Sequence, residues 1–360
     1  MSINFQYLKS IVPGIILALV FCLFSQGINN VLAIEIFGTT KSPISTVLIA
    51  ILLGILMGNA FTPRPGMMIG LDFTQQYILK LGIIFLGIRL SFEELIKFGS
   101  IAIPLIICCI VGVLILVKLL IKKVPISSKM SYLIAIGTSV CGATAIVATA
   151  PVINAKKSEV AYAIANITLF GVIAMIVYPY FAEWYFDNDA LKIGLFLGTS
   201  IHETSQVAAA GLIYDQQFNS PETLNVATVT KLIRNTFLVI LIPLFAFLYN
   251  RGELKGQNYS ILSIFPYFVI GFIGMIIVRN IGDQFFTSDN NAYDFWINLI
   301  GYLKTLATVF LTMAMAAVGI SINLSELKSM GYKPFVVGLI AAVTVGFISL
   351  IYIETLTKFI

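Results

Sequence analysis

The sequence contains little charge and almost no histidine. Of its 360 residues, 11% are charged, 59% are hydrophobic and one is histidine. Soluble domains usually carry about a quarter charged residues, so a soluble enzyme is excluded. The net charge of +5 implies no nucleic-acid partner. The low content of charged residues and the high content of hydrophobic residues predict a single integral membrane domain over residues 1–360, with lipid as its solvent.

Several sequence signals are also absent. The four cysteines lie inside apolar stretches without metal-ligand or redox spacing: Cys22, Cys108, Cys109 and Cys141. His202-Glu203 has no second histidine at the spacing of a zinc-protease helix. No small-residue cleavage site follows the first apolar run. We therefore expect no metal, no cofactor, no enzymatic activity and no cleaved leader.

What the sequence has is a succession of eleven apolar segments. Because only helices and closed barrels satisfy the backbone in lipid, and no strand-like alternation is visible, they predict an all-α polytopic membrane protein with about 9–11 transmembrane segments. The segments are 11–32, 43–60, 78–95, 101–120, 130–154, 160–181, 190–214, 232–249, 264–278, 297–322 and 335–352.

The chain also repeats itself. Residues 137–144 read Gly-Thr-Ser-Val-Cys-Gly-Ala-Thr, and residues 198–205 read Gly-Thr-Ser-Ile-His-Glu-Thr-Ser. A second echo, with Gly, Glu and Gly at identical spacing, joins 87–99 to 319–331, and a weaker one joins 54–59 to 274–280. These echoes predict a first repeat over 33–181 and a second over 190–352, with the elements in rotated order.

Parity and loop charge predict the topology. If segments 130–154 and 190–214 are re-entrant hairpins, the two members of every repeated pair have opposite orientations in the membrane. If both segments cross the membrane, some pairs are antiparallel and others are parallel, which one symmetry relation cannot produce. The basic pairs Lys122-Lys123 and Lys156-Lys157 flank segment 130–154. The positive-inside rule favours one side for both, with the N-terminus in the cytoplasm. Discontinuous helices that cross remain the alternative.

The repeated motifs are the candidate binding site. Glycines at membrane depth allow a helix to break, and the free N–H groups of a half-helix, with nearby hydroxyls, attract anions. Small-residue helix packing is the alternative interpretation of such residues. The candidate ligands are Gly137, Thr138, Ser139, Cys141, Gly142, Thr144, Gly198, Thr199 and Ser200.

Five ionisable or amide side chains complete this candidate site. Glu203 is the carboxylate that lies well inside an apolar segment, where a charge is costly and a functional role is the default. With His202 and Gln206, it is the candidate for coupling transport to a proton. Lys231 and Arg234 lie about one helical turn apart at the start of segment 232–249, where they would offset the charge of an anion. Elsewhere, Lys304 either serves a solute or extends to the interface.

Three motifs resemble a known family. Residues 137–146, 201–211 and 231–235 are similar to the signatures of the YeiH-like family of bacterial inner-membrane proteins, often labelled sulfate exporters. The family looks like a distant relative of transporters of the sodium–proton antiporter or bile-acid-carrier type. The resemblance implies a bacterial inner-membrane transporter with inverted repeats and paired broken helices.

Together these observations predict a secondary transporter of a small anion, such as sulfate or an organic sulfonate or carboxylate. Proton or sodium coupling, contact with membrane lipid and a homodimer formed through the remaining helices are further expectations. Two alternatives stay open. One is a cation-coupled carrier of a neutral or organic solute, and the other is a membrane-embedded enzyme or sensor.

Overall fold

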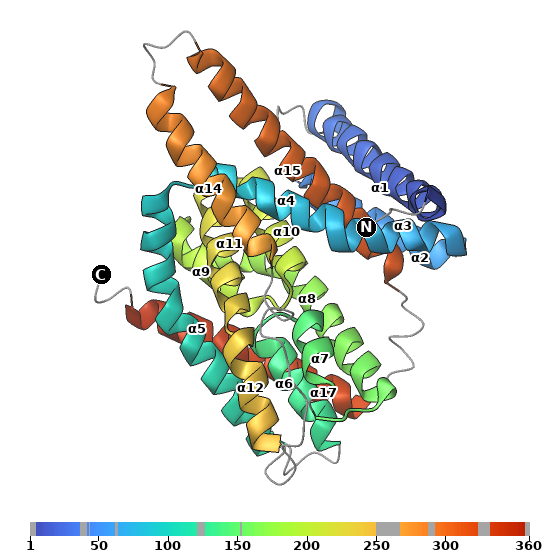
Figure 1. Ribbon diagram of the computed structural model, residues 1–360, viewed down its shortest axis with the longest axis vertical. Helices are drawn as coiled ribbons and strands as arrows, with labels where there is room; N and C mark the ends of the chain where they lie inside the picture. Colours follow the sequence, from blue (N-terminus) through green and yellow to red (C-terminus); the bar gives the residue numbers. More distant parts are fainter. Residues whose placement is uncertain are drawn as a thin grey trace. The chain divides into compact units, whose positions relative to one another are not determined.

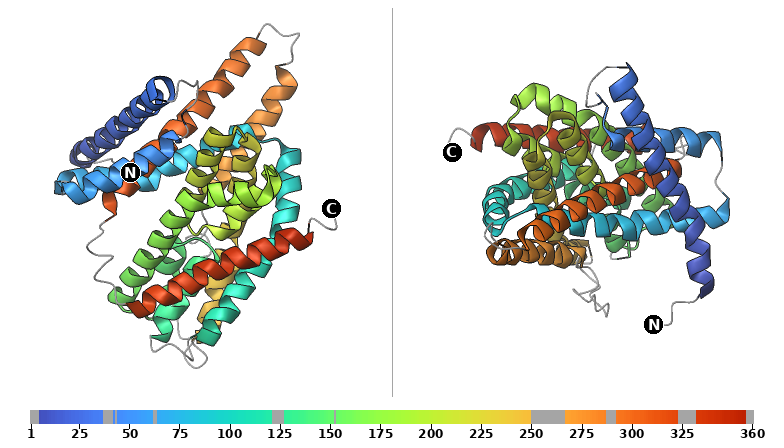
Figure 2. Two further views of the ribbon diagram at one scale, coloured as in Figure 1. Left: turned by 180° about the vertical axis from the view of Figure 1, so that it is seen from behind. Right: turned by 90° about the horizontal axis from the view of Figure 1, so that it is seen from above.

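The computed structural model describes residues 5–36, 42, 44–61, 64–120, 127–151, 153–249, 267–286, 292–322 and 332–356. These ranges are helical and contain no strand, so the predicted all-α class is confirmed (Figures 1 and 2). The basic pair Lys122-Lys123 and the echo residues Glu326 and Gly331 lie outside the described residues.

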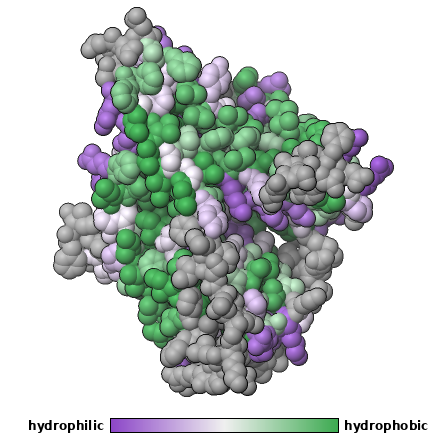
Figure 3. All heavy atoms as spheres, viewed as in Figure 1, coloured by the Kyte–Doolittle hydropathy of each residue, from purple (hydrophilic) through white to green (hydrophobic). Residues whose placement is uncertain are grey.

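Within the described chain, eight helices are long and apolar enough to cross a membrane. They are Lys9–Glu35, Pro65–Arg89, Phe92–Leu119, Ser158–Phe186, Pro221–Ile242, Phe268–Phe285, Tyr293–Ser321 and Phe335–Thr355. Many large apolar side chains on these helices are exposed, including Phe24, Ile96 and Ile270. Apolar residues accordingly cover much of the described surface in Figure 3. Such a surface is stable in contact with lipid, so the chain is a polytopic membrane protein.

The described chain divides into two compact units. Unit 1 comprises the described residues of Met1–Glu94, Leu212–Pro221 and Phe268–Glu326. Its elements are α1 (Phe5–Val31), η1 (Leu32–Ile36), α2 (Thr46–Ala60), α3 (Pro65–Phe73), η2 (Thr74–Ile78), α4 (Leu79–Leu86), η3 (Gly87–Arg89), α14 (Phe268–Phe285) and α15 (Tyr293–Ser321). Helix α15 packs against α1, α2 and α4.

Glycines set the closest approach in unit 1. A Cβ atom added to Gly54 would lie 2.6 Å from the Ala316 carbonyl, and one added to Gly58 would lie 2.1 Å from the Ile320 carbonyl. Helices α2 and α15 therefore touch through their backbones. Small residues at helix contacts are the usual means of association in lipid, where no hydrophobic force joins helices.

Unit 2 comprises the described residues of Leu95–Gly211, Glu222–Tyr267 and Leu327–Ile360. Its elements are α5 (Phe92–Leu120), α6 (Ser128–Ser139), α7 (Ala143–Thr149), α8 (Lys157–Phe186), α9 (Ala190–Ser200), α10 (Thr204–Phe218), α11 (Pro221–Thr236), α12 (Leu238–Tyr249) and α17 (Tyr332–Leu356). The first three residues of α5, the last seven of α10 and Pro221 of α11 belong to unit 1. Helix α17 packs across α6, α8 and α9 (Figure 2).

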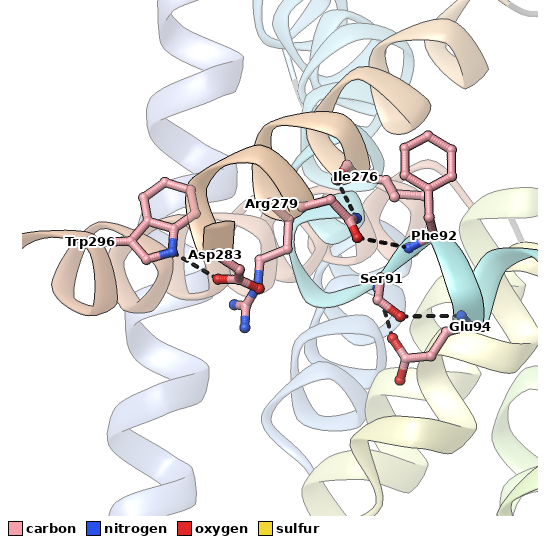
Figure 4. Close-up of polar contacts among 8 residues, drawn as sticks. Ser91, Phe92, Glu94, Ile276, Arg279, Asp283 and Trp296 are labelled. Carbon is pink, nitrogen blue, oxygen red and sulfur yellow. Dashed lines mark hydrogen bonds and ion pairs between the residues drawn. The ribbon is translucent and has the colours of Figure 1, made fainter. Parts of the chain in front are cut away.

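Two predicted segments have wrong boundaries. Segment 78–95 was expected to begin at Ile78 and end at Leu95. The helical stretch begins earlier, at Pro65, and it ends before Glu94: it stops at Arg89, and α5 begins at Phe92. The reason is a capping box, in which the Glu94 N–H donates to Ser91 Oγ at 3.1 Å and the Ser91 N–H donates to the Glu94 carboxylate at 2.8 Å (Figure 4). This exchange satisfies the first donors of α5 and fixes its start.

The second boundary concerns segment 232–249. Lys231 and Arg234 do not open a helix, because α11 already begins at Pro221 and both residues lie deep within it. Polar residues such as Asn225, Thr228 and Thr230 lower the hydropathy of its first half, although all three are buried. The N-terminal part of α11 was not predicted, because it has neither an apolar composition nor a regular helical spacing of apolar residues.

The division into units bears on the predicted repeats. Unit 1 contains both members of the predicted pairs 43–60 with 264–278 and 78–95 with 297–322. Unit 2 contains both Gly-Thr-Ser motifs, 137–144 and 198–205. The units therefore keep predicted equivalents together, and the inverted relation itself stays a prediction.

Candidate functional site

The first Gly-Thr-Ser motif forms the tip of a hairpin between α6 and α7. Lys129, at the start of α6, donates its Nζ to the Asn154 carbonyl just beyond α7 at 2.7 Å. Ser127 and Glu159, on either side of the hairpin, share a hydrogen bond. The two arms therefore begin and end together. At about 1.5 Å per residue, the 12 residues of α6 extend about 18 Å, well short of a bilayer core of about 30 Å.

The second motif forms the tip of a hairpin between α9 and α10, as their contacts with α11 show. Along α9, Gly194 lies against Val226 and Gly198 against Thr230, so α9 and α11 run parallel. Along α10, Thr204 lies against Asn235, whereas Gly211 lies against Leu224, so α10 and α11 are antiparallel. Helices α9 and α10 therefore run in opposite directions.

Both hairpins break at the same place in the repeated motif. Helix α6 ends at Ser139 and α7 begins at Ala143, while α9 ends at Ser200 and α10 begins at Thr204. The first break turns at Gly142, whose φ of +55° with ψ of −125° is a conformation that L side chains rarely adopt. A Cβ there would also lie 2.4 Å from Glu203 Cγ. Glycine is thus required at this position on two grounds.

Lys231 joins the two tips. Its side chain is 0% exposed, and its Nζ donates to the Val140 carbonyl at 2.8 Å, to the Ile201 carbonyl at 3.0 Å and to the His202 carbonyl. An ammonium group has three donors. All three are therefore directed at the backbone of the two breaks.

Arg234, one helical turn further along α11, joins the arms just below the tips. It is also 0% exposed. Its Nε donates to the Ser139 carbonyl at 2.7 Å, a second nitrogen donates to the Thr138 carbonyl, and the third donates to the Thr199 carbonyl at 2.5 Å. One guanidinium therefore holds the C-terminal turns of both α6 and α9.

These bonds explain why two cations are buried at membrane depth. The last carbonyls of a helix have no partner within the helix and form its negative pole, roughly half an elementary charge. Two such poles meet where α6 and α9 end, and Lys231 and Arg234 neutralise them. Lys231 and Arg234 were expected to offset the charge of an anion; the partners that they contact here are the protein's own backbone carbonyls, and the role toward an anion stays a prediction.

Glu203 lies on the other side of the break. Its carboxylate accepts a hydrogen bond from the Ala143 N–H at 3.1 Å, and its side chain is partly exposed. The Glu203 carbonyl accepts the first helical bond of α10, from Val207, at 2.9 Å. The preceding N–H groups of α10 thus have no helical acceptor. Glu203 therefore links the two hairpins at the beginnings of their second arms.

Several hydroxyl, amide and imidazole atoms at or beside the tips are buried without a hydrogen-bond partner among the described residues. They are Ser139 Oγ, Ser200 Oγ, Thr230 Oγ1, His202 Nδ1 and Gln206 Oε1. Ser139 and Ser200 occupy the same place in the two motifs. A buried polar group without a partner costs about 1–3 kcal/mol. Both hairpins therefore place a buried serine hydroxyl at the same position of their breaks.

The remaining predicted ligands divide into exposed and packing residues. Cys141 is partly exposed, with its Sγ 3.7 Å from Thr204 Oγ1, and Thr144 is exposed. By contrast, the Thr199 hydroxyl contacts Ser349 Oγ at 2.7 Å. Gly137 and Gly198 are positions where a Cβ would clash with neighbouring side chains. A solute would therefore meet Cys141, Thr144 and Glu203 before it met the glycines.

Gln206 and two residues that were not predicted as site residues, Asn235 and Ser349, also contact the elements of the hairpin tips. Gln206 donates to the Thr168 carbonyl at 3.2 Å and so anchors α10 to α8. Asn235 donates to Thr204 Oγ1 at 2.8 Å. Its place one helical turn after Lys231 could have indicated this role. Ser349 comes from α17, and no sequence signal connects it with the site.

Comparison with known proteins identifies the family. The model of the family described as Conserved hypothetical protein 698 matches residues 13–338. The UPF0324 membrane protein FN0533 of Fusobacterium nucleatum is 33% identical over 322 residues, which cover 88% of this chain and 91% of the relative. The chain belongs to the UPF0324 family of membrane proteins.

Two other members of the UPF0324 family have similar coverage. The membrane protein SAG1125 of Streptococcus agalactiae is 32% identical over 330 residues, 92% of this chain and 93% of the relative. The inner membrane protein YeiH of Escherichia coli K12 is 33% identical over 306 residues, 82% of this chain and 81% of the relative. The predicted resemblance to YeiH-like proteins is therefore confirmed, and so is a location in a membrane.

Proposed function

We propose that this UPF0324 protein is a secondary transporter of a small anion, with sulfate and organic sulfonates or carboxylates as the candidate substrates. The observation that carries the proposal is the meeting of two hairpin tips around buried Lys231 and Arg234. Secondary transporters typically bind their solutes where broken helices meet near the middle of the membrane. The predicted inner-membrane location and cytoplasmic N-terminus are part of this proposal.

The charge balance at the tips favours an anion. Lys231 and Arg234 contribute two positive charges and Glu203 one negative charge. The four half-helix ends contribute about half a charge each, two of each sign, and so cancel. The described residues of the tips thus retain about one positive charge. An uncompensated charge in a membrane is costly, and a bound anion would remove that cost.

Glu203 is the proposed coupling residue. Its carboxylate already accepts a hydrogen bond at the beginning of α7, so an approaching anion would compete with it for the same positive region. Protonation of Glu203 would remove that competition and would raise the net positive charge by one. Proton binding and anion binding would then favour each other, which is the thermodynamic requirement for cotransport. The neighbouring His202 and Gln206 would support this step.

A ligand-stabilisation screen of purified protein tests the proposal. Sulfate, ethanesulfonate and acetate would be compared with glucose at equal ionic strength and at several pH values. A ligand that binds the native state and not the unfolded state stabilises the protein by RT ln(1 + L/Kd), where L is the free ligand concentration, so the melting temperature rises with L. We expect stabilisation by an anion that increases toward acid pH. Stabilisation by glucose or by sodium ions alone would contradict the anion hypothesis.

Variants of two glutamates make this screen specific. Glu203→Gln removes the proposed proton acceptor and should abolish the pH dependence of anion stabilisation. Glu222→Gln is the matched control, because Glu222 is exposed at the start of α11. An unchanged pH dependence in Glu203→Gln would assign the coupling to another group.

A further inference from the structure

Unit 1 contains a second cluster of charges, formed by Arg89, Arg279, Lys304, Asp215 and Asp283. Arg89 ends η3, and its guanidinium pairs with Asp215 at 3.0 Å. Arg279, on α14, pairs with Asp283 at 2.6 Å. Lys304 lies on α15 next to Leu303, which packs against the hydrophobic cluster of Ile88, Trp296 and Ile300 where η3 and α15 meet. The cluster thus joins α14, α15, η3 and the end of α10 within this unit.

The bonding capacity of the two carboxylates is largely used. Asp283 accepts from Trp296 Nε1 at 2.8 Å in addition to Arg279, and it lies between these two side chains in Figure 4. Asp215 holds one nitrogen of Arg89. Among the described residues, three cations therefore accompany two carboxylates, and one positive charge has no carboxylate partner. In a membrane-spanning segment such a charge is costly, and a functional role is its default interpretation.

Two donors of the cluster are free to bind a ligand. Arg89 Nε is buried and has no hydrogen-bond partner among the described residues. Lys304 is partly buried about 16 Å along α15, at 1.5 Å per residue. No described carboxylate lies within the 4.0 Å of an ion pair of its Nζ. An ion-pair network that served only to hold the helices would leave neither donor unused.

The geometry points to a second anion-binding site in unit 1, formed by Arg89, Arg279 and Lys304 and suited to a small oxyanion or halide. Arginine presents paired donors to such ligands, and lysine supplies a point charge. None of these three residues belongs to the hairpin tips. It would hold an anion whether or not the tips carry one across the membrane.

Tryptophan fluorescence provides a local test. The chain contains two tryptophans, and Trp184 is 77% exposed, so Trp184→Phe leaves Trp296 as the reporter beside Asp283. Quenching of Trp296 would be measured with iodide, an anion, and with caesium, a cation, at constant ionic strength. The ratio of the two quenching constants reports the local charge, and changes in general accessibility cancel in it. The assay requires no transport activity.

We expect iodide to be favoured in the Trp184→Phe parent. Lys304→Gln removes one positive charge about 6 Å from the bound probe, which in water changes its local concentration by about threefold. Because the lysine attracts iodide and repels caesium, the two changes multiply, and the ratio should fall by about tenfold in Lys304→Gln and stay near the parent value in Lys304→Arg. Lys192→Gln, a lysine outside the cluster, is the matched control and should leave the ratio unchanged.

Two results would overturn the site. They are a ratio in the parent no higher than that of free N-acetyltryptophanamide, and a ratio that Lys304→Gln leaves unaltered. These outcomes are independent of the hairpin tips, so failure of the proposed transport function would be seen separately, in the stabilisation screen. A fall in the ratio that Lys304→Arg prevents would support the site even if no anion stabilises the tips.

Discussion

Arg234→Met tests the bridge between the two hairpins. The substitution keeps much of the side-chain volume and removes the donors that hold Thr138, Ser139 and Thr199. These carbonyls are buried inside unit 2, and methionine offers them no donor. The C-terminal turns of α6 and α9 would lose the guanidinium that they share, and Lys231 would be the remaining cation at the two negative helix poles.

The expected loss of stability follows from the bonds removed. Hydrogen bonds to charged groups contribute about 1.5–3 kcal/mol each in soluble proteins, whereas bonds between membrane helices average about 0.6 kcal/mol. Removal of a buried guanidinium also relieves a desolvation penalty of several kcal/mol. Together these effects predict a decrease in the free energy of unfolding of about 2–5 kcal/mol.

Unfolding by sodium dodecyl sulfate in mixed micelles, followed by circular dichroism, would measure this decrease. Lys192→Met is the control, because Lys192 pairs with Asp189 on the same hairpin at 3.6 Å but is 25% exposed. Such a pair contributes about 0–1 kcal/mol. The reasoning would be refuted if Arg234→Met and Lys192→Met lowered the stability equally.

Three further predictions concern the elements around the site. Gly142→Ala should destabilise the protein by about 1–3 kcal/mol, because its backbone conformation is unfavourable for alanine, and the same unfolding assay should show it. Ser91→Ala should cost about 1 kcal/mol through loss of the α5 cap, and an unchanged melting temperature would contradict this. Cysteines replacing Lys129 and Lys156 in a cysteine-free background should react with a membrane-impermeant thiol reagent from one side. Reaction from opposite sides would show that the segment between them crosses.

Much of the architecture could be predicted because its signals are local. Apolar length predicted the spans, and the repeated Gly-Thr-Ser motifs located both breaks to within a few residues. The capping box of Ser91 and Glu94 was also visible in the sequence, but it was overlooked within a longer apolar run. The polar first half of α11 was missed because burial by other helices, rather than hydropathy, keeps it inside.

The sequence could predict which residues belong to the candidate site, but not which atoms they contact. The sequence indicated that Lys231, Arg234 and Glu203 belong together, since each is an ionisable group in an apolar region. It could not show which partner each one has, because those partners are backbone carbonyls and N–H groups that helix breaks expose. Contacts such as that between Thr199 and Ser349 depend on packing over 150 residues of separation, which no local pattern encodes.

The most direct test of the central claim is anion flux into proteoliposomes. Uptake of radiolabelled sulfate, with ethanesulfonate and acetate as competitors, would be measured with and without an imposed pH gradient, for the parent protein, Glu203→Gln and the control Glu222→Gln. The account predicts saturable uptake of sulfate or competition by one of the other anions. An acid pH on the side of the anion should stimulate this uptake in the parent and in Glu222→Gln, but not in Glu203→Gln. The account would be contradicted by the absence of saturable sulfate uptake. It would also be contradicted if the pH gradient changed the uptake equally in all three proteins.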